Sequence, residues 1–292
     1  TTALAALSSA QLAALGTGNI TAVASGSISA LGSAALAGLS AAEAGVLSTG
    51  QIASLGSAQL ATLSSTALTG IDLGITAIGT AAFAGLGSAQ LAALATDQAE
   101  ALTTAQSSAL SSAQINGLSS ASMANLGTQA VSVLTTTALA ALSSAQLAAL
   151  GTGNITAVAS GSISALGSAA LAGLSAVQVS TMDISILNLQ TAQFAALTSQ
   201  AIAGLTTGAV SGLTSADVIA LTTTEIAALT TSAIGALIST QIAAFTSTQI
   251  PALTTSQLVT LTTTQAGYFT NAQVPYFTGN QLAAMTADIS VL

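Results

Sequence analysis

This chain of 292 residues contains no lysine, arginine, histidine, cysteine or tryptophan. Without histidine and cysteine it lacks the usual zinc, copper and haem ligand sets, and it cannot form a Cys–His or Ser–His–Asp nucleophile system. Without lysine it can form neither a Schiff base nor the usual P-loop contact to phosphate. Without any positive side chain it cannot bind nucleic acid by counterion release. We therefore expect no enzymatic activity, no catalytic residue, no cofactor, no metal and no nucleic-acid partner.

Charge of either sign is scarce, because 8 acids are the only charged side chains and give a net charge of −8. Hydrophobic residues make up 51% of the chain, yet Ser, Thr, Gly, Asn or Gln interrupts them every few positions. No run approaches the roughly 18–20 apolar residues that span a bilayer, so we expect no membrane span. The chain begins at Thr1 without a basic segment, so we expect a mature chain or a piece of a longer one.

A repeat of eight residues runs through the whole sequence. Starting from Leu7, a large apolar residue that we call the anchor recurs every eight residues as far as Leu292. A second apolar site precedes nearly every anchor by three positions, and four small polar residues, often ending in Gln, complete the unit. Three units have seven residues instead of eight: 72–78, 183–189 and 286–292. We interpret residues 1–292 as one continuous octapeptide-repeat solenoid.

A longer duplication overlies the octads, because residues 1–41 recur identically as residues 136–176. Each seven-residue unit also contains one aspartate, at Asp72, Asp183 and Asp288. We interpret these carboxylates as caps that close a shortened turn. Their spacing in sequence does not show that they share a face.

The octad cannot be one continuous helix, because its apolar pair would drift about 80° around the helix with each unit. The polar stretch predicts short helices instead, since Ser8 and Gln11 have the spacing of a capping box. The pairs Ser40/Glu43, Thr214/Asp217 and Thr222/Glu225 repeat that spacing with acids. Glycine often follows the anchor, where a helix C′ residue would lie. The favoured fold is an all-α array of very short capped helices, one for each octad.

A β-solenoid with one octad on each side is the alternative. Pro251 and Pro275 lie inside the expected helices, where proline is costly, and the later half is rich in Thr, Ile, Val, Phe and Tyr. However, apolar sites three residues apart do not follow the alternation of a strand, so a corner would have to lie between them. In either fold a single octad buries too little apolar surface to order itself, so its stability must come from stacking on neighbours.

Few residues could carry chemistry, and each has a structural interpretation. Asp97 and Glu100 are the only acids within three residues of each other, which is too few ligands for calcium. The pairs Tyr268-Phe269 and Tyr276-Phe277 could form a carbohydrate platform, although we favour aromatic packing in the core. Asn19-Ile-Thr21 and its copy Asn154-Ile-Thr156 match the short glycosylation pattern. The threonines alternate too freely with other residues for a regular ice-binding face.

Units such as Leu221-Thr-Thr-Thr-Glu-Ile-Ala-Ala-Leu229 and Leu261-Thr-Thr-Thr-Gln265 resemble the "LTTxQIxAL" octapeptide arrays of very large bacterial secreted or surface adhesin-like proteins. The resemblance covers essentially the whole chain. It implies an extracellular or cell-surface location and a structural or adhesive role, often as a stalk or fibre, and it carries over no catalytic residue.

We therefore expect a structural extracellular protein that self-assembles into a filament, sheath or surface layer. The octad frame runs unbroken to both ends, which favours a homopolymer through head-to-tail contacts. The low charge would also permit lateral contacts. The alternative is a stalk or binding segment of a large surface adhesin, with a glycan or host surface as its partner, and ice binding is less favoured.

Overall fold

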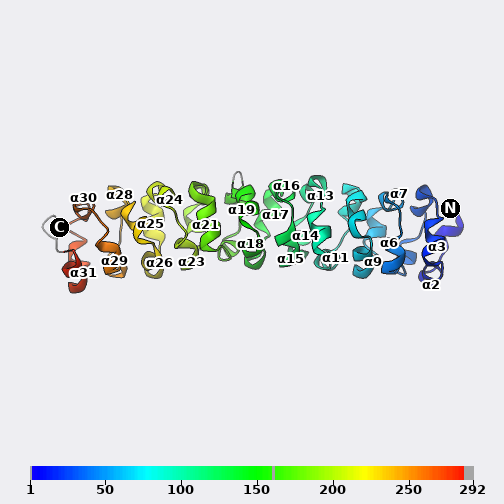
Figure 1. The fold of residues 1–292 in the computed structure, drawn as a ribbon, viewed down its shortest axis with the longest axis horizontal. Coiled ribbons are helices and arrows are strands. Elements are labelled where there is room, and N and C mark those ends of the chain that lie inside the picture. Colours follow the sequence, from blue (N-terminus) through cyan, green and yellow to red (C-terminus); the bar gives the residue numbers. More distant parts are fainter. Residues whose placement is uncertain (1, 160–161, 286–292) are drawn as a thin grey trace. The chain divides into compact units, whose positions relative to one another are not determined.

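The computed structural model describes residues 2–159 and 162–285. Within them every regular element is a short α-helix or 3₁₀-helix, and there is no strand (Figure 1). The protein is an all-α repeat solenoid. The prediction of very short capped helices along the octads is therefore confirmed, and the β-solenoid alternative is wrong.

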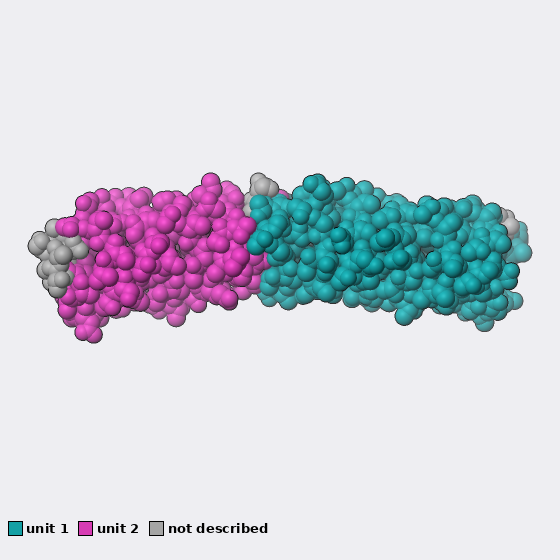
Figure 2. All heavy atoms as spheres, viewed as in Figure 1, with its two compact units in different colours: residues 1–157 teal, residues 158–292 magenta. Residues whose placement is uncertain are grey.

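The chain divides into two compact units, residues 1–157 and 158–292, and the division falls within helix α19 (Figure 2). The helices that begin in the first unit are α1 (Thr2–Ala5), α2 (Ser9–Ala13), α3 (Gly16–Thr21), α4 (Ser25–Ile28), α5 (Ser33–Leu36), α6 (Ala41–Gly45), α7 (Thr49–Ala53), α8 (Ser57–Leu60), α9 (Ser65–Gly70), η1 (Asp72–Ala77), α10 (Thr80–Phe83), α11 (Ser88–Ala92), α12 (Thr96–Glu100), α13 (Thr104–Ser108), α14 (Ser112–Gly117), α15 (Ser120–Asn125), α16 (Thr128–Ser132), α17 (Thr136–Ala140), α18 (Ser144–Ala149) and α19 (Thr152–Ala159).

The helices of the second unit are η2 (Ile163–Ala165), α20 (Ser168–Leu171), α21 (Ala176–Met182), η3 (Asp183–Asn188), α22 (Thr191–Phe194), α23 (Ser199–Ile202), α24 (Thr207–Gly212), α25 (Ser215–Ala220), α26 (Thr223–Ala228), α27 (Thr231–Gly235), α28 (Ser239–Ile242), η4 (Ile250–Ala252), α29 (Thr255–Leu258), α30 (Thr263–Ala266), η5 (Val274–Tyr276) and α31 (Gly279–Ala284).

Helix α26 shows why each octad turns. Thr222 is extended (φ −74°, ψ 166°), and its side chain accepts a hydrogen bond from the Glu225 N–H while the Glu225 carboxylate accepts from the Thr222 N–H. The predicted capping boxes at Ser8, Ser40 and Thr214 are formed in the same way. The helix ends at Leu229, which is extended again (φ −57°, ψ 134°). Two extended residues in the octad accommodate the β-branched residues that favoured strands.

Proline does not break the array, because the octads that contain it form 3₁₀-helices instead of α-helices. Pro251 lies in η4 and Pro275 in η5, in each case within the first two helical positions. An N–H at those positions has no partner within the helix, so proline removes no hydrogen bond there.

The glycines that follow an anchor do not serve as helix C′ residues, so that prediction is wrong. Gly32, Gly56, Gly87 and Gly127 have φ between −61° and −87°, and each is the N-cap of the next helix. Among the described glycines, Gly16 alone has a positive φ, of 70°. Anchors such as Leu126 and Leu229 leave their helices in an extended conformation rather than through a left-handed turn, so glycine is not required for the exit.

The core of each unit is built from the two apolar sites of the octad. In α26 and its anchor, for example, Ile226 is 0% exposed and Leu229 is 4% exposed. Fully burying such a side chain contributes about 1.5–3 kcal/mol. At octad 103–110 the first apolar site is Ser107 instead, whose buried hydroxyl oxygen has no hydrogen-bond partner.

Successive coils stack through helices that lie three octads apart. The contacting pairs include α6 with α9, α11 with α14, and α23 with α26. Side-chain hydrogen bonds also join octads four apart, because Gln51 in α7 donates to the carbonyl oxygens of Ile20 and Val23. One coil therefore takes between three and four octads.

The seven-residue units that the structure describes are the 3₁₀-helices η1 and η3, and both begin with an aspartate in the left-handed region. The φ angles are 53° at Asp72 and 46° at Asp183, and no other described non-glycine residue has a positive φ. Asp183 accepts a hydrogen bond from the Thr206 hydroxyl, which lies in a later octad. The third predicted aspartate, Asp288, lies outside the described residues. Asp72 and Asp183 thus set the backbone geometry at which a shortened unit begins.

Candidate functional site

The residue just before the first apolar site carries the contacts between coils. When it is Gln, its Oε1 accepts from the N-cap N–H of its own helix while its Nε2 donates to two backbone carbonyls of an earlier coil. For Gln241 the acceptors are Val210 O at 2.7 Å and Leu213 O at 2.8 Å, and Oε1 accepts from the Ile238 N–H at 2.9 Å. One amide thus caps its own helix and binds the coil before it.

We call this set of bridging residues the glutamine ladder. Its members in the first unit are Gln51, Gln59, Gln90, Gln98, Gln106, Gln114 and Gln146. Its members in the second unit include Gln193, Gln241, Gln249, Gln257, Gln265, Gln273 and Gln281. The carbonyls usually lie 31 and 28 residues earlier, but a seven-residue unit shortens both distances by one: Gln90 donates to Leu60 and Leu63.

A second kind of contact between coils has alanine instead of glutamine at the position just before the first apolar site. In these octads a glycine follows that alanine by three residues. In α23, Ala201 is fully buried, and a Cβ added to Gly204 would lie 2.1 Å from the carbonyl oxygen of Ala176. Gly38, Gly70 and Gly85 follow Ala35, Ala67 and Ala82 in the same way, with equivalent separations of 2.2–2.3 Å. At these octads the coils meet backbone to backbone, so their contact depends on the missing side chain.

Acids at the ladder position keep the cap but cannot supply the donor. The Oε2 atom of Glu43 accepts from the N–H and hydroxyl of Ser40 at 2.9 and 2.7 Å, while its Oε1 is buried without a partner. Glu225 accepts from the Thr222 N–H at 2.7 Å and makes no hydrogen bond to the coil before it. Because a carboxylate is an acceptor only, it cannot satisfy the carbonyls that glutamine binds elsewhere.

A shallow groove lies in the first unit. It has a volume of about 430 Å³ and lies between the C-terminal ends of α12 and α15 and the N-terminal ends of α16 and α19. Its wall is Glu100, Ala124, Asn125, Leu126, Gly127, Thr128, Gly151, Thr152, Gly153 and Asn154. A Cβ added to Gly151 would meet nothing within 4 Å, and one added to Gly153 would meet only Thr128 Oγ1 at 3.8 Å.

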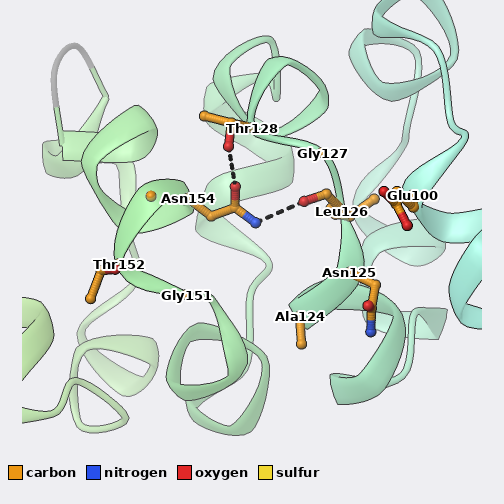
Figure 3. A pocket seen from close by; sticks show the side chains of 10 residues that line it. Glu100, Ala124, Asn125, Leu126, Gly127, Thr128, Gly151, Thr152 and Asn154 are labelled. Atoms are coloured by element: carbon orange, nitrogen blue, oxygen red, sulfur yellow. Dashed lines mark hydrogen bonds between the residues drawn. The ribbon is translucent and has the colours of Figure 1, made fainter.

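The groove exists because Asn154 stands at a ladder position. Its Nδ2 reaches the Leu126 carbonyl at 2.8 Å, and its Oδ1 accepts from the Thr128 hydroxyl at 3.0 Å (Figure 3). Asparagine is one methylene shorter than glutamine, and it binds one carbonyl instead of two. The exposed Glu100 carboxylate lines the same groove, and the Asn125 amide nitrogen is already bound to Ala121 O at 2.8 Å. The groove can therefore offer oxygen acceptors to a hydroxylated or cationic ligand.

The other predicted acids do not come together. Asp97 accepts from the N–H of Gln98 at 2.9 Å, which is a local contact at the start of α12. No group of three or more acids in the ranges 2–159 and 162–285 could hold a metal ion. None of the helices in these ranges is long and apolar enough to cross a bilayer.

The aromatic pairs separate into core and surface. Phe269 and Phe277 are buried and meet edge to face with ring centroids 4.9 Å apart, and Phe269 also stacks with Phe245 at 6.5 Å. Tyr276 is 48% exposed, whereas Tyr268 is half-buried. Core packing therefore applies to the phenylalanines but not to Tyr276.

The two glycosylation patterns differ in accessibility. Asn19 is exposed and its side chain donates to the Leu15 carbonyl at 2.9 Å. Asn154 is 7% exposed and binds the preceding coil. In the folded chain the second pattern is thus unavailable to a glycosylating enzyme.

One comparison with known proteins gives a match. The family model described as the ALTTAQ repeat matches residues 186–223, 210–247 and 220–255, all of them within the second unit. Neither the curated proteins nor the solved structures include a match to this chain. Residues 186–255 are therefore similar to ALTTAQ repeats, which supports a repeat family for this protein.

Proposed function

We propose that this chain is a structural, extracellular repeat protein that self-assembles into a filament, sheath or surface layer. The observation that supports this proposal most is the glutamine ladder. The residue types that recur in the octad are used for the helix cap, the core and the joint between coils, as Gln241, Val210 and Leu213 illustrate. In this proposal the chain has no catalytic role.

Repetition of the joint gives a route to assembly. Where glutamine occupies successive ladder positions, the same donor and carbonyls recur, so one face of such a coil is complementary to the opposite face of an equivalent coil. A contact that repeats by one operation without closing generates a filament rather than a ring. The net charge of −8 over 292 residues opposes lateral packing only weakly.

The test is negative-stain electron microscopy combined with light scattering on the purified chain over a hundredfold range of concentration. We expect uniform filaments that lengthen with concentration, and more lateral bundling in 1 M salt because charge repulsion is screened. Particles of single-chain mass at every concentration would contradict the proposal. A broad hydrolase screen on the same sample checks that no substrate is consumed.

The groove favours a second candidate, a binding segment of a large surface adhesin. Glu100 and Asn125 would accept hydrogen bonds from the hydroxyl groups of a glycan. The test is a glycan array that compares three proteins. These are the unmodified chain, a groove variant that carries both Glu100→Gln and Asn125→Ala, and the control Asp97→Asn, which loses the same single negative charge. Binding that the groove variant loses and the control retains would support this role. Absence of binding, or equal binding by all three proteins, would exclude the groove as a glycan site.

A further inference from the structure

The glutamine ladder of the second unit is interrupted for more than one coil. We name residues 199–237 the unlatched turn, because its ladder positions are Ala201, Ala209, Asp217, Glu225 and Ala233. We name residues 239–285 the latched turn, because its ladder positions are all glutamine: Gln241, Gln249, Gln257, Gln265, Gln273 and Gln281. Since a coil takes between three and four octads, five successive positions without glutamine remove the amide bridges from a complete coil interface.

The latched turn is bound to the coil before it throughout. Each of its six glutamines donates to two or three carbonyls about one coil earlier, over distances of 2.6–3.4 Å. The acceptors of the first four glutamines lie in residues 210–237, and those of Gln273 and Gln281 lie in residues 242–253 of the latched turn itself. Most of these bonds are buried, and the bonds of Gln265 lie nearer the surface. Opening this interface would separate these carbonyl groups from the glutamine amides that now donate to them.

The unlatched turn has no such amide bridge to the coil before it. Its side-chain hydrogen bonds to that coil join exposed groups: the Thr191 hydroxyl donates to Asp217 at 2.9 Å, and the Thr206 hydroxyl donates to Asp183. By the register of the ladder, the Glu225 side chain faces the carbonyls of Phe194 and Leu197, to which it cannot donate. Apolar burial and the close approach at Gly204 hold this interface instead.

In the first unit the gaps between ladder glutamines are shorter. Ala67 to Ala82 and Ser122 to Ala138 each span three octads. Ser122 also retains a weak bond from its hydroxyl to Leu94 O at 3.4 Å. Asn19 to Glu43 spans four, but only Ala35 and Glu43 of that run have residues 28 and 31 positions before them in this chain. A gap that covers a complete coil interface thus distinguishes the unlatched turn from the gaps of the first unit.

We propose that the interface between the unlatched turn and the coil before it is a built-in opening plane, at which the second unit separates first under load or denaturant. Two net hydrogen bonds change an opening equilibrium by about one order of magnitude. The anchors are buried in both turns, so we assign the difference in opening to the missing bridges. This property belongs to the single chain and does not depend on filament formation.

The test is hydrogen–deuterium exchange followed by mass spectrometry on the full chain, with rates corrected for the intrinsic exchange of each peptide. We expect amides of residues 199–237 to exchange about tenfold faster than those of residues 239–285. Equal protection of the two turns would overturn the proposal, and so would faster exchange in the latched turn.

Two substitutions between glutamate and glutamine, which have nearly the same shape, provide the matched controls: one adds an amide donor and the other removes one. Glu225→Gln restores a donor, and we expect it to slow exchange in residues 222–229 by about tenfold. Gln257→Glu removes a donor from the latched turn, and we expect a similar acceleration in residues 254–261. Circular dichroism establishes that each variant is folded. Unchanged exchange in Glu225→Gln would contradict the role of the missing bridge even if Gln257→Glu failed to fold.

Discussion

The Nε2 atom of Gln257 donates to the backbone carbonyl oxygen of Leu229 at 2.7 Å, although the two residues are 28 positions apart. The same amide donates to Ile226 O at 2.9 Å, and its Oε1 accepts from the Thr254 N–H at 2.7 Å. A single side chain therefore couples the start of one helix to the end of another helix in the preceding coil. In a chain without salt bridges from basic side chains, buried amides take the role of specific cross-links.

Gln257→Ala is expected to lower the thermal midpoint, because it removes the bridge and leaves the buried Leu229 carbonyl without its donor. The expected cost is about 1–3 kcal/mol. Gln11→Ala is the control, since exposed Gln11 caps Ser8 and its amide nitrogen donates to no carbonyl of another coil among the described residues. Far-ultraviolet circular dichroism during heating measures both variants. A loss for Gln11→Ala as large as that for Gln257→Ala would show that capping, not bridging, explains the effect.

Glu43→Gln is expected to stabilise the first unit by about 1 kcal/mol, because it replaces an unpartnered buried acceptor by a donor. The same exchange occurs just beyond the duplication: residue 178, which lies 135 positions after Glu43, is glutamine. Glu100→Gln is the control, since it removes the same charge from an exposed side chain. Urea unfolding compares the midpoints. If both variants shift the midpoint equally, the gain comes from reduced net charge rather than from the restored bridge.

The helices and their caps could be predicted from the octad because both arise within eight residues. Thr222 and Glu225, or Ser8 and Gln11, carry the whole capping signal in their types and spacing. The number of octads in a coil could not be predicted, since a period of eight fits a coil of three units as well as one of four. The bridging role of glutamine was also missed. Its signal was the frequency of Gln over Glu, because a cap accepts either residue but a bridge needs a donor.

Identical sequence also adopts two backbone conformations in this chain. Leu15 is helical (ψ −35°) and Gly16 has a φ of 70°, whereas the copy Leu150 is extended (ψ 127°). Asn19 binds Leu15 O within its own helix, while Asn154 binds Leu126 O in the preceding coil. Since the local sequences are the same, contacts between coils decide these conformations. The groove at Asn154 depends on the same contacts, so it could not be predicted from the octad alone.

Gly204→Ala is expected to destabilise the second unit by at least about 1–3 kcal/mol, because its Cβ would lie 2.1 Å from the Ala176 carbonyl oxygen and force the backbones apart. Gly279→Ala is the matched control, since nothing lies within 4 Å of its Cβ position in the same unit. Thermal unfolding measures both. A neutral Gly204→Ala variant would mean that the coils can separate there without loss, and that the close approach contributes little.

Substitutions of Asp72 test whether the positive φ angle is needed where a seven-residue unit begins. Its φ of 53° strains a β-branched side chain most and glycine not at all, so Asp72→Val is expected to cost about 1–2 kcal/mol, whereas Asp72→Gly leaves stability nearly unchanged. Asp97→Val is the control, because Asp97 is also exposed and acidic but lies in the ordinary helix α12. Urea unfolding ranks the three variants. If Asp72→Gly cost as much as Asp72→Val, the carboxylate rather than the backbone geometry would explain why aspartate occupies the shortened units.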